Sequence, residues 1–166
     1  MLKIRKTYLS LVLLHILVTV GFALVFGTSH PFASQYEVNN LYPLITSSMT
    51  LATILYALGG YLFVIATENK NKLFAKIMIA SLLFTIILII IWVSVLFLSL
   101  NGIQRNIWLV YIISNYPTAI ILNSIINNAD LHSWVIGLTI IPPALGFIIG
   151  TFLRLIYEPH WRKNNE

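Results

Sequence analysis

Long apolar runs dominate the chain, and four of them are long enough to cross a lipid bilayer. A helix needs about 20 residues to cross about 30 Å of hydrocarbon, and each run must be helical because lipid offers unpaired backbone groups no partner. The predicted spans are 7–27, 44–66, 76–100 and 134–155. The sequence therefore predicts an all-α integral membrane protein, with residues 1–166 forming a single transmembrane domain built as a four-helix bundle.

A fifth apolar stretch, 107–126, lies between the third and fourth spans and is broken by polar residues and a proline. The interrupting residues are Ser114, Asn115, Pro117, Asn123 and Ser124. Pro117 also disfavours helical geometry at the residue before it. We predict an outer re-entrant or interfacial segment here, and a fifth span buried in the bundle is the alternative.

The basic residues choose between four and five spans, because Lys and Arg concentrate in cytoplasmic segments. Nine of the ten fall on one side if there are four spans: Lys3, Arg5, Lys6, Lys70, Lys72, Lys76, Arg154, Arg162 and Lys163. Only Arg105 then lies outside, whereas five spans would divide them six against four. We therefore predict a multi-pass plasma-membrane protein of bacterial type with both termini cytoplasmic and an uncleaved first span.

The amino-acid composition excludes several kinds of partner and site. Hydrophobic residues make up 58% of the chain and charged residues only 9%, against about 25% charged in an ordinary soluble domain. The net charge of +5 contains no dense basic block with interleaved aromatics, so no nucleic-acid partner is expected. The absence of cysteine excludes disulfides and thiolate metal sites. No metal or other cofactor is predicted, and the expected partner is first of all the lipid bilayer.

His15 lies near the middle of the first predicted span and is the only ionisable residue deep in any span. An ionisable side chain at that depth points by default to function, such as a proton relay or haem ligation. The alternative, which we favour, is a neutral imidazole hydrogen-bonded to a neighbouring helix.

Pro142 and Pro143 lie at the centre of the fourth predicted span. Two prolines remove two backbone donors, so the carbonyls of Leu138 and Thr139 lose their α-helical partners and the helix should kink or break. Freed carbonyls at membrane depth, with the Thr139 hydroxyl beside them, would suit a cation or polar substrate. A kink that only shapes packing is the alternative, and it is favoured.

Small residues mark two helix faces. Gly146 and Gly150 form a GxxxG pattern in the fourth span, and Gly59 and Gly60 lie on a small-residue face of the second. Such glycines let helices approach closely. We expect packing within the monomer, and a homodimer seam is the alternative.

Four residues on the predicted outer side carry groups that can act as acids, bases or metal ligands: His30, Glu37, Asp130 and His132. Two imidazoles and two carboxylates would suit an acid–base site. Nothing in the sequence brings His30 near His132, so chance placement in two polar loops is favoured.

Three functions follow from these patterns, in decreasing order of support. The first is a non-catalytic helper, immunity or regulatory subunit that acts through helix–helix contacts with a membrane-protein partner. The second is a small transporter or channel component that uses the break at Pro142 and Pro143. The third is a membrane enzyme with an outward-facing site. Transporters and enzymes rank lower because no span carries an Asp or Glu and no catalytic motif is present.

Overall fold

The described part of the chain is almost wholly helical and contains no strand. The computed structural model describes residues 4–27, 41–64, 70–101, 107–115 and 136–163. Its elements are α1 (Arg5–Gly27), α3 (Leu41–Phe63), α4 (Lys70–Leu100), α5 (Trp108–Ser114), the 3₁₀ turn η4 (Leu138–Ile140) and α8 (Ile141–Lys163). The all-helical class predicted from the apolar runs is confirmed.

Three helices are long and apolar enough to cross a membrane: Arg5–Leu24, Asn71–Leu100 and Leu138–Tyr157. They correspond to the first, third and fourth predicted spans. The second predicted span, 44–66, falls on α3, which is as long as α1 but is not among the three. A fourth crossing therefore stays a prediction.

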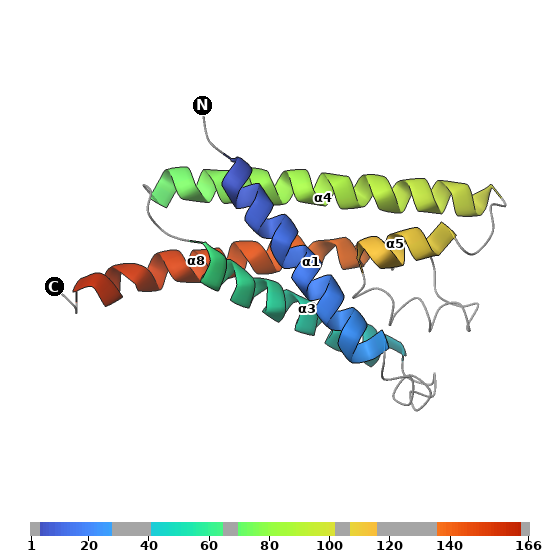
Figure 1. The fold of residues 1–166 in the computed structure, drawn as a ribbon, viewed down its shortest axis with the longest axis horizontal. Coiled ribbons are helices and arrows are strands. Elements are labelled where there is room, and N and C mark those ends of the chain that lie inside the picture. The colour runs from blue at the N-terminus through green and yellow to red at the C-terminus, as the bar shows by residue number, and fades with distance from the viewer. Residues whose placement is uncertain (1–3, 28–40, 65–69, 102–106, 116–135, 164–166) are drawn as a thin grey trace.

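The helices pack as a bundle in which α1 crosses the others obliquely (Figure 1). The main contact joins α3 to α8, and α8 also packs against α4. With 31 residues, α4 is about 46 Å long and extends past α8. The short helix α5 packs against α4 there, in line with α8 (Figure 1).

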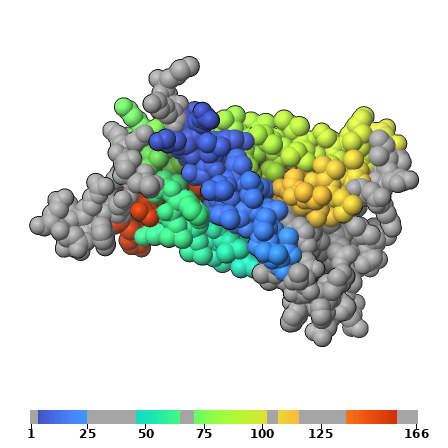
Figure 2. All heavy atoms as spheres, in the orientation of Figure 1, coloured from blue at the N-terminus to red at the C-terminus, as the bar shows by residue number. Residues whose placement is uncertain are grey.

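Large apolar side chains cover the outside of the bundle. Leu13 on α1 is 54% exposed, Leu82 on α4 is 60% exposed and Phe152 on α8 is 51% exposed. The interior, in contrast, includes the polar residues His15, Asn115 and Thr139 beside its apolar core. A soluble protein would expose few such apolar patches. This distribution is the one expected when hydrocarbon surrounds the helices. Figure 2 shows α1 lying over the space between α3 and α4 on one face.

Candidate functional site

Several polar residues of the interior meet at one place, which we call the polar junction. Its members are His15 of α1, Tyr56 of α3, Tyr111 and Ser114 of α5 with the adjoining Asn115, and Thr139 of η4. His15 is the centre of one half of it. Its Nδ1 lies 2.6 Å from the Tyr56 hydroxyl, and its Nε2 lies 2.6 Å from the Ser114 carbonyl oxygen. The ring of Phe84 on α4 meets the imidazole edge-on at 4.8 Å between centroids. His15 therefore contacts three other helices.

The bond to the Ser114 carbonyl shows which nitrogen of the His15 imidazole carries the hydrogen. A carbonyl oxygen only accepts, so Nε2 carries a hydrogen and donates it. In the neutral ring Nδ1 is then an acceptor, and the Tyr56 hydroxyl donates to it. Both ring nitrogens are thereby used, and the geometry is that of a neutral imidazole bonded to neighbouring helices. Metal or haem ligation by His15 would require breaking one of these two bonds.

The Ser114 carbonyl is available because α5 ends there. Asn115 leaves helical geometry, with φ −149° and ψ 69°, and Pro117 follows two residues later in the sequence. The last four carbonyls of a helix have no partner within it. His15 supplies one of them with a donor from another helix.

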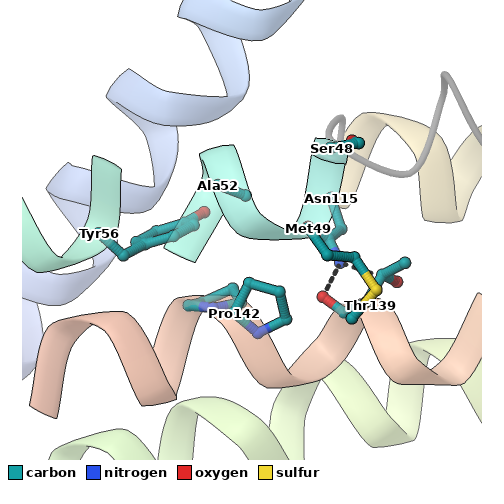
Figure 3. A pocket seen from close by; sticks show the side chains of 8 residues that line it. Ser48, Met49, Ala52, Tyr56, Asn115, Thr139 and Pro142 are labelled. Atoms are coloured by element: carbon teal, nitrogen blue, oxygen red, sulfur yellow. Dashed lines mark hydrogen bonds between the residues drawn. The ribbon is translucent and has the colours of Figure 1, made fainter. Parts of the chain in front are cut away.

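The Asn115 side-chain amide also replaces a missing hydrogen-bond donor, in this case one for a carbonyl at the start of α8. In a continuous α-helix the N–H of residue 143 would bond to the Thr139 carbonyl, and Pro143 has no N–H. The Asn115 Nδ2 donates to that carbonyl at 3.1 Å (Figure 3). The Leu138 carbonyl, which would have paired with residue 142, accepts from the backbone N–H of Ile141 instead.

The double proline thus does not leave the two carbonyls open. The chain tightens into the 3₁₀ turn η4, which replaces one bond with an i→i+3 bond, and α8 begins at Ile141 with both prolines in its first turn. Prolines are tolerated in a first turn because those N–H groups have no helical partner anyway. Cation coordination by these carbonyls would compete with bonds already made.

The Thr139 hydroxyl is also used inside the bundle. It donates to the Ile136 carbonyl at 2.5 Å, and the Tyr111 hydroxyl lies 3.0 Å from it. Since the single hydroxyl hydrogen of Thr139 goes to Ile136, Tyr111 is the donor in the second bond. Tyr111 is completely buried. The second half of the polar junction therefore joins α5 to η4 by the Tyr111 and Asn115 bonds.

A small cavity lies between α3 and the start of α8, beside the polar junction (Figure 3). Its volume is about 10 Å³, which is about the space that one water molecule needs. The lining residues are Ser48, Met49, Ala52, Tyr56, Asn115, Thr139, Pro142 and Pro143. The cavity reaches Thr139 but is too small for a solute larger than water.

The arrangement does not provide a continuous proton path through His15. A proton passing from Tyr56 to Nδ1 would leave from Nε2 toward the Ser114 carbonyl, and an amide oxygen has no proton of its own to pass on. Within the described residues, no three His, Cys, Asp or Glu side chains are grouped to hold a metal ion.

The glycines chosen from the sequence lie at helix contacts. A Cβ at Gly146 would overlap the Thr53 carbonyl, and one at Gly150 would overlap the Ala57 carbonyl. A Cβ at Gly60 would lie 2.6 Å from the Phe147 carbonyl oxygen. These three lie where the backbones of α3 and α8 touch, whereas Gly59 faces the Leu14 side chain of α1.

Of the other sequence candidates, His30, Glu37, Asp130 and His132 lie outside the described residues, as does most of the predicted re-entrant segment 107–126. Sequence reasoning missed the roles of Tyr56, Tyr111 and Asn115. The signal for Asn115 was present, because a primary amide in an apolar run needs a buried partner. It was interpreted only as an interruption.

Comparisons with protein-family models, with curated proteins and with solved structures find no match for this chain.

Proposed function

We propose that the chain is a multi-pass plasma-membrane protein with four spans and both termini cytoplasmic, and that it serves as a non-catalytic helper, immunity or regulatory subunit. It acts through helix–helix contacts with a membrane-protein partner. In this proposal α3 is the second span, and α5 is the inward-running arm of a re-entrant segment.

The topology is supported by where the described basic residues lie. Arg5 and Lys6 begin α1, Lys72 and Lys76 follow the start of α4, and Arg154 lies toward the end of α8. Arg154 donates to the Tyr61 carbonyl near the end of α3 at 2.8 Å, and the starts of α1 and α4 lie toward the same end of the bundle as the end of α8 (Figure 1). One end of the bundle thus carries them all, as the positive-inside rule expects of a cytoplasmic side.

The helper role is carried by one observation: the side chains of the polar junction are hydrogen-bonded to one another or to neighbouring backbone carbonyls, beside a cavity of about 10 Å³. Because these groups are already bonded and the cavity is small, contacts with another protein would be made by the outer surface of the bundle. That surface is apolar along α1, α4 and α8, so the contacts would be made within the bilayer by van der Waals packing.

A photo-cross-linking experiment tests this role. A photoreactive residue is placed at Ile90 of α4, which is 58% exposed, and at Leu88, which is 2% exposed, as the matched buried control. Equivalent exposed positions are Leu13 on α1 and Phe152 on α8. We expect a cross-link to one discrete membrane protein from at least one exposed position and none from Leu88. Lipid adducts alone from all exposed positions would contradict the helper role.

A transport role is the second candidate, because the cavity has a polar lining of Ser48, Tyr56, Asn115 and Thr139 at the double-proline turn. To admit a solute the cavity would have to widen between α3 and the start of α8. Water access to Ser48, on the cavity wall, measures this opening.

A further inference from the structure

One side of the short helix α5 is apolar and exposed. Leu109 and Val110 are 53% and 51% exposed, and Ile113 is 73% exposed. These three side chains adjoin one another, because residues three and four apart are neighbours on a helix, and we call them the outer face of α5. Tyr111, on the other side of the helix, is completely buried. Figure 2 shows α5 at the surface of the bundle, beside α1 and α4.

One end of α5 lies at the depth of the middle of α1. The His15 Nε2 lies 2.6 Å from the carbonyl oxygen of Ser114, the last residue of α5. The apolar span Arg5–Leu24 of α1 has its midpoint between Leu14 and His15. Since α1 crosses the membrane in the proposed topology, the end of α5 at Ser114 lies near the centre of the bilayer.

The other end of α5 lies at the end of α4. The Trp108 Nε1 donates to the Ser99 hydroxyl at 3.0 Å, and α4 ends one residue later, at Leu100. This is the outer end of α4 in the proposed topology. From Trp108 to Ser114 the helix advances by about 9 Å, which fits within the roughly 15 Å between the centre and the edge of the hydrocarbon.

The outer face of α5 presents only hydrocarbon to its surroundings. The Ser114 hydroxyl donates to the Tyr111 carbonyl at 2.9 Å, and the Tyr111 hydroxyl bonds to Thr139 inside the bundle. At the same depth on α1, Leu13 and Ile16 are 54% and 52% exposed. The outer face of α5 therefore continues the apolar exterior of a helix that is long and apolar enough to cross the membrane.

We propose that the outer face of α5 is a contact surface for lipid acyl chains of the outer leaflet, from the edge of the hydrocarbon down to the bilayer centre. Depth and the absence of charge select this partner: residues 107–115 contain no charged side chain, and both ends of α5 are bonded to membrane-crossing helices. A helix of seven residues would be marginal in water, whereas lipid favours backbone groups paired within a helix. The inference rests on the proposed topology and not on the helper role.

Spin labels on single introduced cysteines test this surface in the full chain, reconstituted into phosphatidylcholine vesicles. Collisions with oxygen, which concentrates at the bilayer centre, are compared with collisions with a water-soluble nickel chelate. The label positions are Leu109→Cys and Ile113→Cys on α5, Ile90→Cys and Leu100→Cys on α4, and Lys72→Cys as the water-exposed control. We expect the oxygen-to-nickel ratio to rise several-fold from Leu109 to Ile113 and to fall several-fold from Ile90 to Leu100. The two helices run through the outer half of the bilayer in opposite directions, so the two gradients should have opposite signs.

Three results at α5 would overturn the proposal. A ratio at Ile113 as low as that at Lys72 would mean that water covers the outer face, and infrequent collisions with both reagents would mean that protein covers it. Equal ratios at Leu109 and Ile113 would mean that α5 lies flat at the interface. If a labelled Ile113→Cys variant unfolds at a lower temperature than the unmodified chain, Val110→Cys replaces it and should show a ratio well above that of Lys72.

The gradient along α4 separates this inference from the proposed topology. A flat, low ratio from Ile90 to Leu100 would refute membrane crossing by α4 and the topology with it. A normal gradient along α4 with any of the three contrary results at α5 would refute the lipid contact of α5 alone. Neither outcome bears on whether a partner cross-links to α1, α4 or α8, so the helper role can fail separately.

Discussion

The contact between α3 and α8 and the polar junction hold their helices together by different means. At the first, Gly60, Gly146 and Gly150 let two backbones touch. At the second, hydrogen bonds from His15 and Asn115 join helix ends that the chain itself leaves incomplete. In lipid the hydrophobic effect does not drive helices together. The bundle therefore depends on close packing in one region and on polar bonds in the other, and the two should fail differently.

The largest effect is expected at the glycine contact. Gly150→Ala places a Cβ on the Ala57 backbone, which cannot move without separating α3 from α8. Overpacking against backbone should cost about 3 kcal/mol of the free energy of unfolding, measured by SDS titration in mixed micelles. Gly21→Ala is the matched control, because nothing lies within 4 Å of its Cβ. It should be neutral or stabilise by up to about 1 kcal/mol, and equal losses in the two variants would refute the close-contact role.

His15 should be the most costly position of the polar junction. His15→Phe keeps a ring of similar size but leaves the Ser114 carbonyl and the Tyr56 hydroxyl without their partner. We expect a loss of about 1–3 kcal/mol in the same titration, given roughly 0.6–1.7 kcal/mol per hydrogen bond between membrane helices. Tyr56→Phe removes one of the two bonds, and it should cost little more once His15 is already Phe. Fully additive losses would mean that the two side chains do not interact.

A smaller effect tests the donor that Asn115 supplies to α8. Asn115→Ala leaves the Thr139 carbonyl without its amide donor and should cost about 1 kcal/mol. Pro143→Ala restores a backbone N–H at the position that would normally bond to Thr139. In the Pro143→Ala background, therefore, Asn115→Ala should cost markedly less. The same cost in both backgrounds would show that the amide does not replace the missing N–H.

The sequence predicted the apolar helices well and the polar junction only in part. Length and hydropathy are local, so α1 and α4 fall close to the predicted spans 7–27 and 76–100. His15 and the proline pair were recognised as unusual for the same reason. Their partners were not predictable, because Tyr56 and Ser114 lie 41 and 99 residues from His15, and only the packing of the bundle decides that they meet. The 3₁₀ turn that satisfies Leu138 likewise depends on how α8 begins.

The central claim is that the interior at the polar junction is closed to water, and cysteine accessibility tests it most directly. The chain contains no cysteine, so each introduced thiol is unique. Ser48 lies on the cavity wall and is buried, whereas Lys72 is exposed near the start of α4, so Ser48→Cys and Lys72→Cys form a matched pair. A membrane-impermeant maleimide is applied to intact cells and to inside-out vesicles. We predict that Lys72→Cys reacts rapidly in inside-out vesicles only and that Ser48→Cys reacts in neither. Rapid labelling of Ser48→Cys in a variant that unfolds like the unmodified chain would contradict the closed interior and favour transport.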